Sequence, residues 1–273
     1  MDDLTSTETS RRENAVLVLG SLGRVSIPLL VEGIKRTEDL RVRQLLASLL
    51  QQLGPEATEP LKRELVLEGK AEERSRMLEV VDTVTRDLKT ELAYAFGDGN
   101  APVRQAAFQL AERLNDSHVV NLLLDYARSP ETHLAVEAIE CLGRLKPAAA
   151  VKGLVSLLQS SKEKERLIAC CRTLGQIADP ASIEPLAKIL ARKGFFFHRK
   201  GRADVRATAM FALGQIPHPQ VAKIFLLYRG DPDPRIREIA KTREVSGKPS
   251  SPKPPIKEKP VAAGLDTTPG PHS

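Results

Sequence analysis

The sequence predicts an all-α fold, a right-handed α-solenoid of about seven helical hairpins followed by a terminal helix. Three observations lead to this prediction: an internal repeat of about 31 residues, apolar residues at helical spacing within each repeat, and turn-forming residues between the helices. Leu, Ala, Val and Ile must build the core, because aromatic residues make up only 4% of the 273 residues and Trp is absent.

The repeat is visible when one anchor position is followed along the chain. Successive anchors lie 31, 31, 30, 31, 32, 39 and 31 residues apart. The anchors are Arg12, Arg43, Arg74, Arg104, Ala135, Leu167, Arg206 and Arg237. In the first seven units the residues three, seven and ten positions after the anchor are apolar, a spacing that places them on one face of a helix. We expect the arginine anchors to contact neighbouring loops rather than a ligand.

A second helix is predicted in each unit after a short turn. These helices cover residues 25–34, 57–66, 88–96, 119–127, 149–158, 182–190 and 220–228. Gly23, Gly54 and Asn115 suit the ends of first helices, while Asp39 and Asp233 suit the beginnings of others. Because one hairpin cannot bury its apolar face alone, the units must stack into a continuous core. We expect the second helices to line the concave face of the stack.

Short sequence patterns within the units resemble a known family. Val-Arg occurs at 42–43, 103–104 and 205–206, Leu-Gly at 19–20, 142–143, 174–175 and 213–214, and Asp-Pro at 179–180. These patterns resemble HEAT repeats, in particular the bacterial phycobilisome-lyase HEAT-like repeat, over residues 9 to about 245. The resemblance implies a non-catalytic scaffold or adaptor that binds an unidentified protein. The alternative that it implies is a bilin-lyase-type enzyme subunit acting on a phycobiliprotein-like target.

No residue pattern in the sequence indicates catalysis. HEAT-like di-iron hydroxylases take their metal ligands from His-Glu dipeptides, whereas none of the five histidines here precedes Glu. The dipeptides are His118-Val119, His133-Leu134, His198-Arg199, His218-Pro219 and His272-Ser273. The cysteines, Cys141, Cys170 and Cys171, form no CxxC pair and are expected to be buried apolar thiols. We therefore expect no catalytic residue, no metal site and no cofactor.

The positive charge of the chain is concentrated in two segments. Of the net charge of +6, residues 192–206 contribute +5 and the residues from Ser246 onward contribute +2, which leaves −1 elsewhere. A HEAT-like DNA glycosylase would need a broadly basic face for phosphates, so we expect no nucleic-acid partner. The N-terminus lacks the pattern of a signal peptide and no apolar run approaches about 18 residues, which predicts a cytoplasmic protein.

The interval of 39 residues contains an insertion at residues 193–202. The candidate partner-binding residues are Phe195, Phe196, Phe197, His198, Arg199, Lys200 and Arg202. Insertions between repeats map to loops, which often carry binding residues. In one interpretation the phenylalanines pack between units six and seven. In the other they present an aromatic anchor with a cationic rim to a protein, an acidic peptide or an anionic membrane surface.

The chain is predicted to have three parts: a short polar N-terminus at 1–8, the repeat array at 9–245, and a disordered Pro- and Lys-rich tail at 246–273. The first hairpin opens with the apolar run Ala15–Leu19 and has no polar capping unit before it. Because the ends of a solenoid need polar caps, we expect self-association or docking of another protein at the N-terminal repeat. At the other end, the helix at 234–243 is itself expected to be the cap.

Overall fold

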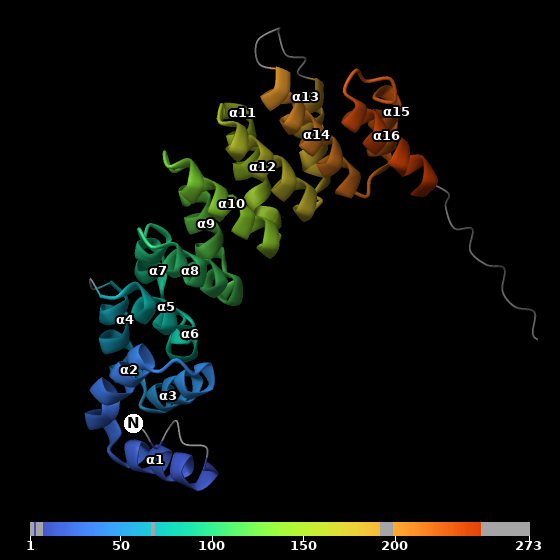
Figure 1. Ribbon diagram of the computed structural model, residues 1–273. Coiled ribbons are helices and arrows are strands. Elements are labelled where there is room, and N and C mark those ends of the chain that lie inside the picture. Colours follow the sequence, from blue (N-terminus) through green and yellow to red (C-terminus); the bar gives the residue numbers. More distant parts are fainter. Residues whose placement is uncertain (1–2, 4–7, 67–68, 192–198, 247–273) are drawn as a thin grey trace, which may run out of the picture.

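The computed structural model describes residues 3, 8–66, 69–191 and 199–246, and these form a curved stack of helical hairpins (Figure 1). The first helices of the units are α1 (Thr9–Ser21), α3 (Leu40–Gln52), α5 (Ala71–Leu78) with α6 (Val81–Val84), α8 (Ala101–Leu114), α10 (Thr132–Leu145), α12 (Lys164–Ile177), α14 (Arg199–Gln215) and α16 (Pro234–Ser246). The second helices are α2 (Ile27–Arg36), α4 (Thr58–Val66), α7 (Lys89–Phe96), α9 (Ser117–Tyr126), α11 (Val151–Ser160), α13 (Ile183–Ala191) and α15 (Pro219–Leu227). Single 3-10 turns, η2 (Gly23–Ser26), η3 (Pro55–Ala57), η4 (Ala148–Ala150) and η5 (Pro180–Ser182), lead into α2, α4, α11 and α13.

The prediction of an all-α solenoid is confirmed, because the described residues contain helices and no strand, arranged as hairpins with α16 at the end. Two of the three predicted core columns are confirmed from the second unit onward. The column ten positions after the anchor is only partly buried, since Leu22 is 46% exposed and four later members, Leu53, Val84, Leu145 and Ile177, are half-buried. From the second unit to the seventh, every residue three or seven positions after the anchor is at most 1% exposed. These residues are Leu46, Met77, Ala107, Ala138, Cys170 and Ala209, followed by Leu50, Val81, Ala111, Leu142, Leu174 and Leu213.

The residues predicted to end and begin helices do so. Gly23, Gly54 and Asn115 have positive φ angles of 57°, 83° and 43°, which allow the chain to leave a first helix and turn back. The carboxylate of Asp39 accepts a hydrogen bond from the backbone N–H of Arg41 at 2.8 Å. That of Asp233 accepts one from the N–H of Arg235 at 2.9 Å, so both aspartates cap a helix N-terminus.

The expectation that the second helices line the concave face is wrong. Figure 1 shows the first helices α3, α8, α10, α12 and α14 on the inner side of the arc and the second helices on the outer side. The physical reason is the spacing of the inner layer, where α12 packs closely against both α10 and α14 while α11 and α13 touch at few points. At Gly175 an added Cβ would lie 2.7 Å from the Cα of Ala212 in the next unit. The stack therefore bends toward the layer in which the helices can approach most closely.

The first helix of the third unit is broken, which the repeat pattern did not predict. α5 ends at Leu78 and α6 begins at Val81, with Val80 at a φ of −130°. The guanidinium group of Arg113, in α8 of the next unit, donates to the carbonyl oxygens of Leu78 at 2.9 Å and Glu79 at 3.2 Å. These bonds satisfy carbonyl groups that a continuous helix would have paired internally.

The arginine column connects neighbouring units, as predicted. Arg43 donates to the carbonyl oxygens of Thr37 and Glu38, both at 3.0 Å, in the loop before its own helix. It also pairs with Glu79 of the next unit. In the sixth unit, where the anchor is a leucine, Arg166 lies one position earlier and donates to Ser129 at 2.7 Å. A buried arginine therefore ties each of these units to an adjacent loop.

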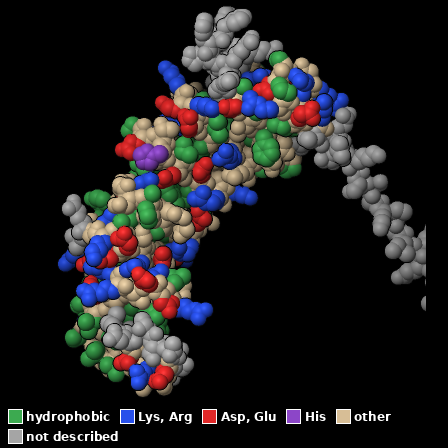
Figure 2. All heavy atoms as spheres, in the orientation of Figure 1, with side chains coloured by type: hydrophobic (Ala, Val, Ile, Leu, Met, Phe, Trp, Pro, Cys, Tyr) green, Lys and Arg blue, Asp and Glu red, His purple; other side chains and the backbone are tan. Residues whose placement is uncertain are grey.

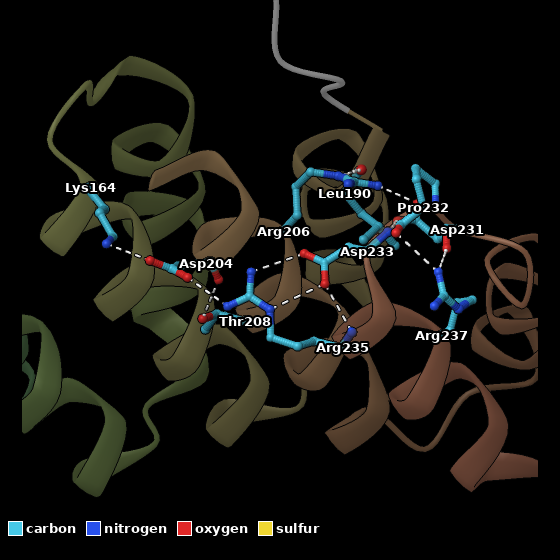
Figure 3. A network of polar contacts seen from close by, with 10 residues as sticks. All are labelled: Lys164, Leu190, Asp204, Arg206, Thr208, Asp231, Pro232, Asp233, Arg235 and Arg237. Carbon is cyan, nitrogen blue, oxygen red and sulfur yellow. Dashed lines mark hydrogen bonds and ion pairs between the residues drawn. The ribbon is translucent and has the colours of Figure 1, made fainter. Parts of the chain in front are cut away.

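A polar network joins units six, seven and eight (Figure 3). Arg206 in α14 donates to the carbonyl oxygen of Leu190 at 2.8 Å and to the carboxylate of Asp231 at 2.5 Å. Asp204 lies between Lys164 of α12, at 2.6 Å, and Arg235 of α16, at 2.7 Å. Side chains of three successive inner helices are thereby linked, which fixes the position of the terminal helix.

Candidate interaction surface

The sequence-predicted partner-binding loop lies largely outside the described residues. Phe195, Phe196, Phe197 and His198 are not described. Arg199, Lys200 and Arg202 belong to the first turn of α14, and their side chains also lie outside the described part. Whether the loop packs between units or binds a partner therefore stays a prediction.

A group of exposed apolar side chains lies on the first hairpin, at the N-terminal end of the stack. We call it the N-terminal patch; its members, between 46% and 78% exposed, are Leu17, Val18, Leu22, Val25 and Leu29. Figure 2 shows hydrophobic side chains gathered at this end of the molecule. Large exposed apolar patches on a folded protein usually mark interaction sites.

The sequence of α1 explains why part of the patch must be exposed. The run Ala15–Leu19 has five consecutive apolar residues, which cover every side of a helix rather than one face. Only one side of α1 can face the core, and there Ala15, Val16 and Leu19 are half-buried. Leu17 and Val18 are left on the surface, at 68% and 58% exposure.

Val18 occupies a position that is buried in all later hairpins. It lies six residues after the anchor, and the equivalent residues are at most 6% exposed. They are Leu49, Val80, Leu110, Cys141, Thr173 and Ala212. This position faces the preceding unit. The hydroxyl of Thr173 donates to the carbonyl oxygen of Ile139 at 2.9 Å. The thiol of Cys141 lies 3.8 Å from the carbonyl oxygen of Phe108.

Leu29 occupies the corresponding position in the second helices, a position that faces the preceding unit. These helices align in a column beginning at Ser26, whose later members are Ala57, Leu88, Val119, Ala150, Ser182 and Val221. The residues five positions after this column, such as Lys62 and Leu124, contact the second helix of the next unit. Their contacts there are residues three positions after the column, namely Glu91 for Lys62 and Gly153 for Leu124. Lys62 lies 3.6 Å from Glu91, and a Cβ added to Gly153 would lie 2.7 Å from Leu124.

Leu29 stands three residues after Ser26 and is therefore in the receiving position, yet it is 52% exposed. Val18 and Leu29 together show that the N-terminal patch includes the face on which a preceding unit would stack. The sequence predicted the apolar run in α1 as an interaction surface but placed Leu22 in the core column, and it did not predict the exposure of Val25 and Leu29. Aligning the second helices would have revealed Val25, since its equivalents are Glu56, Asp87, His118, Ala149, Ala181 and Gln220.

A comparison with protein families identifies the repeats. Two overlapping segments, residues 88–169 and 120–195, match the sequence model of HEAT repeats. The repeats within residues 88–195 are therefore HEAT repeats. The predicted family is therefore confirmed at this level. None of the curated proteins matches the sequence.

Solved structures similar to this chain include three of different kinds. Human deoxyhypusine hydroxylase in complex with glycerol is 17% identical, with 88% of this chain and 91% of that chain covered and a TM-score of 0.40. The complex of CpcE and CpcF of phycocyanin lyase from Nostoc sp. PCC7120 is 19% identical, with coverages of 83% and 90% and a TM-score of 0.35. A designed armadillo repeat protein is 15% identical, with coverages of 79% and 97% and a TM-score of 0.38. No function follows from similarity at this level.

Two hollows lie on the outer side of the HEAT repeats, between α7 and α9. One, of about 470 Å³, is lined by groups of both charges, among them Arg86, Lys89 and Asp116. The other, of about 590 Å³, is lined by Lys89, Tyr94 and Tyr126 among others. The mixed charges of the first hollow select neither anions nor cations, so we assign no ligand to it.

The potentially reactive side chains of the HEAT repeats are buried. All three cysteines are free and have no measurable exposure. Burial raises the pKa of the Cys141 and Cys170 thiols to about 12 and raises that of Cys171 as well. Over the described ranges, no three His, Cys, Asp or Glu side chains cluster closely enough to hold a metal ion.

The length and composition of the helices in the first hairpin can be compared with those of a membrane-spanning segment. No single described helix is long and apolar enough to cross a bilayer. The pair Asn14–Ser21 and Gly23–Arg36, bent by 117°, reaches the required length and composition when taken together. This reflects the same apolar residues that form the N-terminal patch.

Proposed function

We propose that this chain is a non-catalytic scaffold that binds another protein through its N-terminal end. One observation carries the proposal: the unit-stacking face of the first hairpin is uncovered. In later units the positions of Val18 and Leu29 are in contact with the preceding unit. A partner that presents apolar helices would complete the same kind of contact.

Energetic considerations support a partner at this face. Removing a Leu or Val side chain from water contributes roughly 1.5–3 kcal/mol when the burial is complete. The five patch side chains are about half to three-quarters exposed, so covering them offers a sizeable gain. This gain must exceed the loss of translational and rotational freedom on association. A partner with a matching helical surface meets this requirement better than a small ligand, because it can cover exposed side chains of both α1 and α2, such as Leu17 and Leu29, at once.

None of the three cysteines, all in described segments, offers an accessible thiol nucleophile. The cysteines are buried, with raised thiol pKa values that disfavour the thiolate. No observation specifically favours the alternative of a bilin-lyase-type subunit. Mixing the purified chain with a linear tetrapyrrole and recording its absorbance tests that alternative directly, since specific binding would shift the visible bands.

Site-specific photo-crosslinking tests the proposal. A photoreactive amino acid placed at Leu29 in cells expressing the full chain should give a covalent adduct with a protein. The matched control is Glu59, which is exposed on the second helix of the next unit. Adduct formation at position 29 but not at position 59 is the expected result. No adduct at position 29, or equal adducts at both positions, would show that the N-terminal end is not a protein-binding surface.

A further inference from the structure

We infer that the protein bound at the N-terminal patch is a second copy of this chain, with the two N-terminal ends facing each other about a two-fold axis. This inference rests on the proposed function and specifies its partner. A two-fold contact requires one surface to be complementary to itself. A patch composed of apolar Leu and Val side chains on two helices meets this requirement.

The terminal helix α16 differs in chemistry from the N-terminal patch, which favours a contact between two N-terminal patches over the stacking of α16 on a patch. The terminal helix α16 exposes Arg235, Glu238 and Lys241, whose side chains are 51%, 70% and 59% exposed. Stacking α16 of one copy on the N-terminal patch of another would remove charged groups from water against an apolar surface, which is costly. Two N-terminal patches can meet without that cost.

The charges around the patch do not oppose such a contact. Residues 1–36 contain five basic and five acidic residues, so this segment has no net charge. Arg24 is paired with Glu56 at 2.5 Å and Arg11 with Glu8 at 2.9 Å, both on the surface. Like-charge repulsion, which prevents many surfaces from meeting their own copies, is therefore small here.

The size of the patch is sufficient for a modest dimer. Five side chains at 46–78% exposure provide on the order of 500 Å² of apolar surface in each copy, so two copies would bury about 1,000 Å². This is below the roughly 1,200–2,000 Å² of stable specific interfaces and equals the roughly 1,000 Å² that a weak biological interface needs. We therefore expect a concentration-dependent dimer rather than a permanent one.

Sedimentation velocity of the purified full chain tests the inference. The weight-average mass should rise toward twice that of the chain as the concentration approaches about 100 μM. The double variant Val18→Lys/Leu29→Lys should remain a monomer over this range, while circular dichroism shows unchanged helix content. Leu227→Lys is the matched control, because Leu227 is 79% exposed but lies on α15 at the other end of the stack. It should dimerise like the unmodified chain.

A second measurement covers the case in which the double variant fails to fold. A nitroxide attached to Val25→Cys, a position 78% exposed, should show intermolecular dipolar coupling, whereas one attached to Leu227→Cys should not. The natural cysteines do not interfere because all three are buried.

Each other outcome overturns the inference. A monomer at every concentration would exclude the second copy, and an adduct of position 29 with a different protein would then leave the proposed function intact. Loss of dimerisation in Leu227→Lys would indicate a head-to-tail contact instead. A monomer that floats with phosphatidylcholine vesicles through the patch would show that the surface binds lipid, which would overturn both proposals.

Discussion

The guanidinium group of Arg206 and the carboxylate of Asp231 lie 2.5 Å apart, and the two side chains are 11% and 3% exposed. The pair joins α14 to the loop before α16, across the boundary between the seventh unit and the terminal helix. Its burial makes it far more sensitive to substitution than the ion pairs on the surface of the stack.

We expect Asp231→Asn to lower the free energy of unfolding by about 3 kcal/mol, because it leaves a buried guanidinium without its charge partner. Urea denaturation followed by circular dichroism measures this. Asp125→Asn is the control, since the pair of Asp125 with Arg128 is 76% and 51% exposed and should contribute less than about 1 kcal/mol. Equal effects of the two substitutions would contradict the assigned role.

Gly175→Ala is expected to destabilise the protein by about 1–3 kcal/mol. The added Cβ would lie 2.7 Å from the Cα and 2.8 Å from the Cβ of Ala212, so two inner helices would have to separate. Gly20 provides the control because it occupies the same position in the first unit and has no atom within 4 Å of an added Cβ. Gly20→Ala should be neutral or slightly stabilising, since alanine favours helix. Thermal melts of the two variants give the comparison, and a stable Gly175→Ala protein would contradict the close packing.

The stability contributed by Asp204 should depend on pH. Hydrogen bonds from Lys164 and then Arg235 lower the pKa of its carboxyl group below the ordinary value of 3.8. A carboxylate with a lowered pKa stabilises the folded state above its unfolded pKa, and this contribution disappears as the pH falls through the folded pKa. The side chain is 37% exposed, so the contribution should be less than about 1 kcal/mol.

Urea midpoints of the unmodified chain and of Asp204→Asn should therefore differ at pH 7 and converge between about pH 4 and pH 2. Raising the salt concentration at pH 7 should also reduce the difference, because exposed ion pairs are screened. A difference that persists unchanged to pH 2 would show that Asp204 acts through something other than its charge.

The three cysteines should resist alkylation in the folded protein. Their burial and the raised pKa of each thiol both reduce the amount of reactive thiolate. With iodoacetamide at pH 8, mass spectrometry should show almost no labelled protein without denaturant and three labels per chain in urea. Rapid labelling of the native protein would mean that the helices α10 and α12 open readily.

The register of the helices could be predicted from the sequence because it depends on local spacing. Apolar residues three and seven positions after each anchor determine which side of a first helix is buried, and the structure buries them at Leu46 and Leu50 as at Ala209 and Leu213. The direction of curvature depends instead on distances between units. The glycines of the Leu-Gly pairs indicate that a neighbouring helix approaches closely. The sequence alone does not say which helix approaches Gly175, and this determines the direction of curvature.

The candidate surface was only partly predictable for a similar reason. The apolar run Ala15–Leu19 is a local feature, and its partial exposure could be expected because five consecutive apolar residues cover every side of a helix. Leu29 looks like an ordinary member of an amphipathic helix in the sequence. Leu29 is exposed because it occupies the position that contacts the second helix of a preceding unit, as Glu91 contacts Lys62. Only the structure reveals this contact between second helices.

The broken helix of the third unit gives the arc a mechanical consequence. Where α5 and α6 meet, the inner layer consists of two short pieces held partly by side-chain hydrogen bonds from Arg113. Elsewhere the inner layer is made of continuous helices of up to 17 residues, as in α14. Under load, the stack should therefore bend at this joint first, so that its two arms move as levers about the third unit while each keeps its own shape.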